Sequence, residues 1–284
     1  MDVLALLCEA CTMRLPGAAP TSTLADHREH RRCDIDERDA PDAAATNAVT
    51  DTAAAVLDLW DRLVRLTARV GPQEWSRPTP CPDANVHGLI THVAGVNLTT
   101  ASSQDTPTAL VAGVRAARAA EAARIAALRG AEALRPRAGD PAFQRRVLRA
   151  ACLDLWVHHY DLATALGTPV DPEEDSAALS EACAYLLEFT PQLVARGCDT
   201  AEDGDVRIAL QGAVDHDATV TVRDGRGLWS PPHDGAGHTV SGTPGAFVLL
   251  LSGRGDPQHW RDVGALAWSG ARGEAFVRKA RLFG

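Results

Sequence analysis

Two histidines and one aspartate have the residue types and spacing of a metal site. Asp154 and His158 lie four residues apart, so on a helix both side chains project from one face, about one turn from each other. A lone upstream histidine, His92, falls in a second helical pattern, Leu89-Ile-Thr-His92. Two imidazoles and one carboxylate are a common ligand set for a catalytic divalent ion that keeps one coordination position open. We therefore predict that His92, Asp154 and His158 bind a divalent metal, with zinc the expected ion.

Each of these residues also has an ordinary structural interpretation. His92 alone could be a histidine on a half-buried helix face that makes one hydrogen bond. Asp154 and His158 could be a solvated pair worth only roughly a few tenths of a kcal/mol. The intervening Leu155-Trp-Val157 indicates a largely buried helix, where an unpaired carboxylate is costly, and this favours metal binding.

Two further residues are candidate catalytic groups. His159 follows the ligand pair and lies about 100° round the helix, where it is expected either to support a metal ligand from behind or to line the pocket. Arg254 follows Gly253 at the end of an apolar run. It is either a surface arginine that satisfies terminal helix carbonyls or a clamp for a substrate carboxylate.

Three other polar residues are expected to have structural roles. Asp161 is expected to cap or brace neighbouring chain, and His87 to lie near the start of a helix. No base is evident near Cys81 in the sequence, so we expect a structural thiol there.

The composition favours a small-molecule ligand. The net charge of −9 and a pI near 5.5 argue against nucleic acid or an anionic membrane as a partner. The seven cysteines are scattered without a Cys-x-x-Cys pair, which argues against a disulfide framework and a cysteine-rich zinc site. No apolar stretch approaches the length of a membrane span, and the N-terminal Val3-Leu-Ala-Leu-Leu-Cys8 is a poor signal peptide. We expect a cytoplasmic protein, monomeric or homodimeric.

The periodicity of apolar residues predicts two folded units in an α+β chain. Residues 1–44 read as a variable or disordered extension. Residues 45–168 are expected to form a four-helix bundle whose core can hold a metal, with helices over about 47–66, 86–99, 108–134 and 142–166. Residues 169–284 are expected to form a separate α+β domain with an antiparallel sheet. Its expected elements are a helix to about 194, strands at 206–211, 218–223, 227–230 and 238–241, and a helix at 246–252.

Three segments together resemble one family. The loop Trp75-Ser-Arg-Pro-Thr-Pro-Cys-Pro82, followed by Leu-Ile-Thr-His92-Val-Ala-Gly, resembles the DinB-like N-terminal bundle of mycothiol-dependent maleylpyruvate isomerases and their thiol-transferase relatives. The stretch from Asp154 to Gly167 looks like that family's second metal motif, and Val240 to Arg254 is similar to its C-terminal domain. The likeness covers roughly residues 46–270. Asp154 stands where the family usually has Glu, and Asp83-Ala84 where relatives commonly have Gly-Trp.

The resemblance implies a metal-dependent enzyme that uses a low-molecular-weight thiol, with mycothiol as cosubstrate and a small electrophile as second substrate. Because of the two departures, we favour S-transfer, conjugation or thiol exchange over cis/trans isomerisation of the maleylpyruvate type. The shorter carboxylate and the N-terminal extension also motivate a second hypothesis, a non-catalytic thiol-binding or regulatory module. A hydrolase that activates water on the same three ligands is a third.

Overall fold

A computed structural model of the protein describes residues 43–95, 106–130, 140–168, 170–174, 176–197, 203–233, 235 and 237–282. Residues 1–42 of the expected N-terminal extension lie outside the described residues. No helix within the described ranges combines the length and the apolar character needed to span a bilayer.

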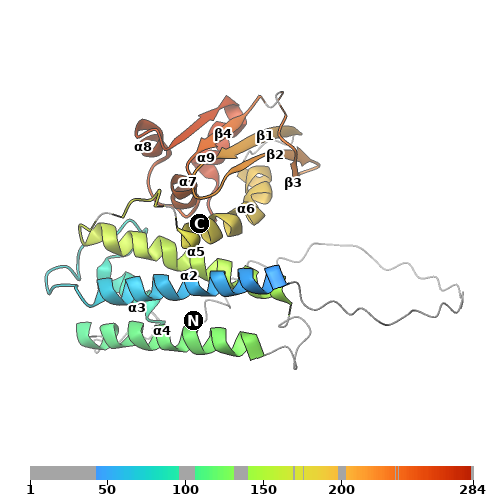
Figure 1. The fold of residues 1–284 in the computed structure, drawn as a ribbon. Coiled ribbons are helices and arrows are strands. Elements are labelled where there is room, and N and C mark those ends of the chain that lie inside the picture. The colour runs from blue at the N-terminus through green and yellow to red at the C-terminus, as the bar shows by residue number, and fades with distance from the viewer. Residues whose placement is uncertain are drawn as a thin grey trace, which may run out of the picture.

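The first part of the described chain is a bundle of helices. Its members are α2 (Ala43–Thr67), α3 (Val86–Val93), α4 (Pro107–Gly130) and α5 (Pro141–Ala165). The long helices α2, α4 and α5 lie side by side, and the short α3 contacts α4 and α5 (Figure 1). The predicted bundle is confirmed, with one correction. The second helix ends at Val93 rather than continuing to residue 99, because Gly95 turns the backbone into the left-handed region at φ +70°.

Local signals set the ends of α5, the helix that carries two of the predicted ligands. The Asp140 side chain accepts a hydrogen bond from the backbone N–H of Ala142 at 3.0 Å, and Pro141 occupies the first turn. At the other end Gly167 has φ +67°, and the N–H of Thr168 donates to the carbonyl of Ala163 at 3.0 Å. The expected helix stop at Gly167 is therefore confirmed.

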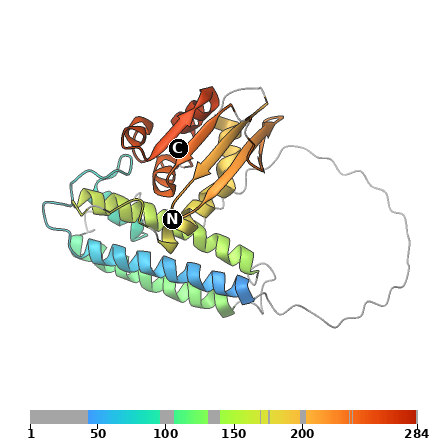
Figure 2. The ribbon, with the colours of Figure 1, turned by 45° about the horizontal axis from the view of Figure 1, so that its top comes forward.

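The second part of the chain is a five-stranded sheet with helices. Its elements are α6 (Ala177–Gly197), β1 (Gly204–Leu210), β2 (His216–Arg223), β3 (Arg226–Ser230), β4 (Thr239–Gly242), α7 (Pro244–Leu251), α8 (Pro257–Asp262), β5 (Leu266–Ser269) and α9 (Gly270–Lys279). The strand order is β3-β2-β1-β4-β5, and the sheet with its helices lies on the α5 side of the bundle in both views (Figures 1 and 2). The α+β fold class is confirmed.

The sheet differs from the predicted one in one pairing. Three of its strand pairs are antiparallel, but β1 and β4 run parallel, with Arg207 opposite Thr239. The hairpin of β2 and β3 occupies one side of β1, so the chain must cross to the other side of β1 before β4 begins. Three further elements, α8, β5 and α9, were not predicted from the sequence. The boundary at residue 168 between two separate units stays a prediction.

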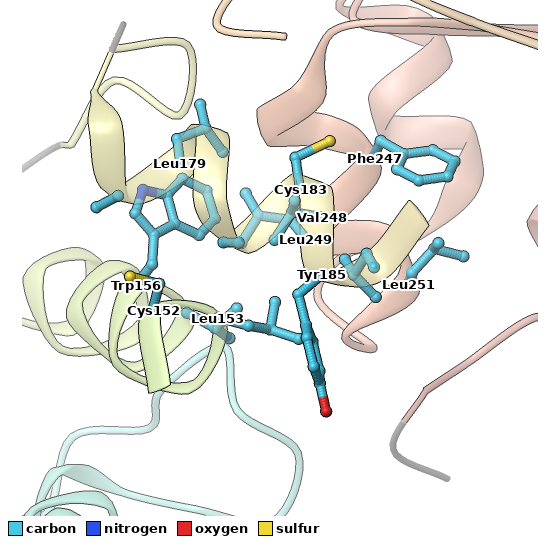
Figure 3. Packing of buried hydrophobic residues seen from close by; sticks show 14 of the residues in the cluster. Cys152, Leu153, Trp156, Leu179, Cys183, Tyr185, Phe247, Val248, Leu249 and Leu251 are labelled. Atoms are coloured by element: carbon cyan, nitrogen blue, oxygen red, sulfur yellow. The ribbon is translucent and has the colours of Figure 1, made fainter. Parts of the chain in front are cut away.

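Helix α6 forms the layer between the bundle and the sheet. Figure 3 shows Leu153 and Trp156 of α5 on one side of α6 and Phe247 and Val248 of α7 on the other. These side chains are buried and belong to one hydrophobic cluster. Burying a large apolar side chain contributes about 1.5–3 kcal/mol, so this cluster holds α7 firmly against the rest of the protein.

The start of α7 lies too close to the loop between α5 and α6 to accept a side chain. A Cβ added at Gly245 would lie 1.9 Å from the carbonyl oxygen of Pro172. We expect Gly245→Ala to lower the free energy of unfolding, measured in urea, by roughly 1–3 kcal/mol through overpacking. Gly88→Ala is the matched control, since the nearest atom to its Cβ would be Asn85 Oδ1 at 3.5 Å. Equal stability of the two variants would contradict the tight docking of α7.

Candidate metal site

The three predicted ligands meet in the folded chain. One ligand atom from each of His92, Asp154 and His158 lies within 4.8 Å of the others, and we call these residues the ligand trio. The two imidazole rings are 4.9 Å apart between centroids, at an angle of 73°. Nε2 of His158 lies 3.4 Å from Oδ1 of Asp154. Two ligands each about 2.0–2.1 Å from a tetrahedral ion stand about 3.3–3.4 Å apart, so the separation of His158 and Asp154 fits one divalent ion and the shorter aspartate reaches far enough to share it.

Two helices position the trio. Asp154 and His158 share one face of α5 through their four-residue spacing. Helix α3 is capped at its N-terminus by Asn85, whose side chain accepts a hydrogen bond from the N–H of Gly88 at 2.9 Å. The buried Leu89 and Ile90 then anchor α3 in the core, and His92 stands in its last turn.

Solvent exposure rises across the trio. His158 is 7% exposed, the Asp154 side chain is 30% exposed, and His92 is an exposed residue. An ion held by these side chains would be fixed from the buried side and accessible from the side of His92. This arrangement suits a catalytic site, which needs one position open to a ligand from solution.

A second carboxylate orients the buried histidine. Nδ1 of His158 lies 3.3 Å from Oδ2 of Asp161, a fully buried residue. Arg254 donates to both oxygens of that carboxylate, from Nε to Oδ1 at 3.2 Å and from Nη2 to Oδ2 at 2.7 Å. A metal-binding histidine usually donates its other ring N–H to a carboxylate or carbonyl, which fixes the ring. With Nδ1–H directed at Asp161, Nε2 is left to face Asp154 and a metal.

The charges of the site favour a cation between Asp154 and His158. Burial by itself would lower the pKa of His158, but the carboxylates of Asp154 and Asp161 outweigh it and raise that pKa to about 9. Burial and the neighbouring His158 lower the pKa of His92. Burial opposes ionisation of Asp154, yet His158 holds its pKa below the ordinary value. Without a metal, a proton on His158 supplies the positive charge that a divalent ion would bring.

Residues 56–103 match the family model described as the mycothiol maleylpyruvate isomerase N-terminal domain. This match supports the resemblance to that family over this part of the chain. The matched range includes α3 with His92 and the C-terminal half of α2, whereas Asp154 and His158 lie beyond it. A search of curated proteins found no match to the chain.

The loop before α3 accommodates Asp83, one of the two departures noted in the sequence. Asp83 has φ +58°. Glycine enters this left-handed region without strain, and Asp is among the few other residues that tolerate it. The Thr79 hydroxyl donates to the carbonyl of Ala84 at 2.8 Å, and the Ala84 N–H donates to the carbonyl of Cys81 at 3.2 Å. The loop therefore keeps a defined path with Asp at this position.

Cys81 lies close to one member of the ligand trio, His158. Its Sγ, a ring nitrogen of His158 and a carboxylate oxygen of Asp161 all lie within 4.8 Å of one another. The sequence suggested no base near this thiol, but folding brings His158 to it from 77 positions further along the chain. Burial raises the pKa of the Cys81 thiol, and Arg254 partly opposes that rise.

Arg254 is buried rather than on the surface. It is 5% exposed, and its Nη1 donates to the carbonyl of Ser252 at 2.5 Å. The expected contact with a terminal helix carbonyl is thus present, but the expected surface position is wrong, because the acidic partner Asp161 draws the guanidinium inward. Its described donors point at Asp161 and Ser252, which makes it a positioning residue for His158. Its role as a substrate clamp stays a prediction.

The two remaining histidines of the sequence analysis lie apart from the trio. His159 is 8% exposed, and burial together with Arg62 lowers its pKa to about 4. The other charges acting on it are mainly those of Glu174 and Asp58, and among the described residues it belongs to neither ligand group. A catalytic role for His159 stays a prediction. His87 packs against the ring of Trp75, at 6.1 Å between centroids, near the start of α3 as expected.

The buried pair of Asp161 and Arg254 is expected to be a strong structural link. Asp161→Asn should lower the free energy of unfolding by roughly 3–5 kcal/mol, because the buried guanidinium loses its counter-charge. Glu274→Gln is the matched control, since the Glu274 and Arg278 side chains are 53% and 52% exposed, and its cost should stay below about 1 kcal/mol. Urea unfolding measures both. Similar losses in the two variants would show that the buried pair adds no special stability.

Proposed function

We propose that this protein is a metal-dependent enzyme that binds a low-molecular-weight thiol, mycothiol by its family, and transfers its sulfur to a small electrophile. The observation that carries the proposal is the convergence of the ligand trio, buried on one side and open on the other, within a bundle of the mycothiol isomerase family. The type of reaction and the identity of the metal are parts of this proposal.

The side chains have distinct roles in this function. A bound divalent ion would lower the pKa of a coordinated thiol, so that thiolate is available near neutral pH. Asp154 supplies the negative charge that holds the ion, and His158 supplies a ring nitrogen whose direction is fixed by Asp161. Arg254 holds the Asp161 carboxylate in place through its two hydrogen bonds. His92 stands at the exposed edge, where the thiol enters.

Sulfur transfer is the reaction that we favour. A new bond forms between the thiol sulfur and an electrophilic carbon, the leaving group departs with its electron pair, and the thiol proton passes to solvent. The Asp83-Ala84 departure supports this choice, because a small side chain replaces the family's tryptophan in the loop that carries Cys81.

The second candidate is cis/trans isomerisation, in which the thiol adds, a bond rotates and the thiol leaves. The name of the matched family favours it.

The metal site can be tested by the metal content of variants. We expect His158→Ala and Asp154→Ala to lose most of the zinc that the wild-type protein retains after loading and desalting, because each removes one of the three ligands. The matched control is His259→Ala in α8, another histidine outside the trio, which should retain full occupancy. Full occupancy in both ligand variants would exclude the proposed site.

Thiol binding is expected to depend on the metal. Calorimetric titration of the zinc-loaded protein with mycothiol should release heat that disappears after chelation and in Asp154→Ala. Heat that persists without metal would instead support a thiol-binding module. Hydrolysis of an ester or amide without added thiol would instead favour a hydrolase that activates water on the same three ligands.

A further inference from the structure

Away from the metal site, a half-buried histidine at the start of β2 lies at the contact between the sheet and α6. We propose that His216 is an acid-sensitive latch, whose neutral ring holds Trp229 of β3 against α6 and whose protonation releases that contact. The inference concerns the sheet alone. It goes beyond the proposed function and does not depend on the metal.

The contact between β3 and α6 is built around a proline inside the helix. Pro191 has no backbone N–H, so it cannot donate the usual helical hydrogen bond to the carbonyl of Leu187. The indole Nε1–H of Trp229 donates to that carbonyl instead, at 3.2 Å. A Cβ added at Gly227 would lie 1.9 Å from the carbonyl oxygen of Pro191, so β3 passes directly against the helix at this point. Trp229 thus supplies from the sheet the hydrogen bond that the proline removes, where α6 packs against β2 and β3 (Figure 1).

The imidazole of His216 packs against the indole of Trp229. The two ring centroids are 4.7 Å apart, and the rings meet at an angle of 69°. Nε2 of His216 is buried and has no hydrogen-bond partner among the described residues. A neutral imidazole carries hydrogen on one nitrogen only, so Nε2 can stay unprotonated in this position. Protonation would place an N–H and a positive charge where no acceptor meets them, which is costly.

The charges near His216 do not compensate that cost. Asp217, the next residue of β2, is the carboxylate that acts on the ring, but its two oxygens accept hydrogen bonds from Arg207 at 2.7 and 2.6 Å. Burial lowers the pKa of His216, and Asp217 opposes this change only in part.

The neighbouring elements also present neutral groups to this end of β2. The β3 strand contributes the indole of Trp229. Helix α6 meets the turn before β2 through the Ser180 hydroxyl, which donates to the carbonyl of Ala213 at 2.8 Å. In the same turn, the carboxylate of Asp215 faces the N–H of Gly212, at 3.4 Å. The described contacts therefore direct no free carboxylate at the imidazole.

Acid acts against the closed latch. In the unfolded chain His216 takes up a proton at its ordinary pKa of about 6.5, whereas in the folded chain its pKa is lower. The stability that the neutral ring contributes is complete above the ordinary pKa and falls as the pH drops below it, because the unfolded chain then binds more protons. The folded chain can accept the proton by turning the ring to solvent. Trp229 then loses the ring that packs against it, and its bond to the Leu187 carbonyl is opened to water.

Urea unfolding at about pH 7.5 and about pH 5 tests the titration of His216. We expect the wild-type protein to lose more stability between these pH values than His216→Phe, whose ring can pack but takes up no proton. His216→Gln is a second variant without a titrating ring, and its side chain is smaller than phenylalanine. The matched control is His259→Phe, because His259 also contacts a tryptophan, Trp260, at 5.0 Å between centroids, but is exposed. This control should lose as much stability as the wild-type protein.

Amide hydrogen exchange at the same two pH values, corrected for the intrinsic effect of pH on exchange, tests the latch itself. On acidification, the amides of β3 and of α6 around Pro191 should become less protected in the wild-type protein than in His216→Phe. An equal pH dependence of stability in the wild-type protein and both His216 variants would overturn the proposal. Unchanged protection of β3 and α6 in acid would also overturn it, because His216 would then titrate without releasing the contact.

Discussion

The buried carboxylate of Asp161 is the point on which the site and the two halves of the chain depend. It lies on α5, is fully buried, and has Arg254 from the C-terminal half on one side and His158 on the other. An isolated buried charge costs several kcal/mol, so this carboxylate requires its guanidinium partner. Arg254 reaches it only because α7 packs against α6, and α6 packs against α5. The direction of the His158 ring is therefore set by the packing of the C-terminal half.

This dependence reconciles two opposing demands on the candidate site. Metal ligands must be held rigidly, yet one side of the ion must stay open. The buried side carries the fixed contacts among His158, Asp161 and Arg254, whereas His92 stands at an exposed edge on a short helix. The rigidity of the site thus comes from the buried Asp161–Arg254 ion pair behind His158. It does not require the metal to be enclosed on all sides.

Sequence reasoning succeeded where the signals are local. The apolar period and the end signals predicted the positions of α2, α4 and α5 within a few residues, and the four-residue spacing predicted the shared face of Asp154 and His158. It failed where partners are far apart in sequence. Arg254 and Asp161 are separated by 93 positions, and neither residue carries a local sign of the other. The parallel pairing of β4 with β1 is likewise set by the path of the chain between β3 and β4. The four residues of β4 carry no local sign of it. A local signal was available for α8, whose first turn is capped by Asp256 ahead of Pro257.

The loop departure shows how one position can change while the site keeps its geometry. At φ +58° the backbone of Asp83 has the conformation that glycine adopts most easily, so the family's glycine and this aspartate can follow the same path. The hydrogen bonds that hold the loop come from Thr79 and the backbone of Ala84, and none of them requires a tryptophan side chain. Ala84 can therefore replace the larger residue without moving Cys81. The expected consequence is a change in the space beside Cys81, with the geometry of the ligand trio unaltered.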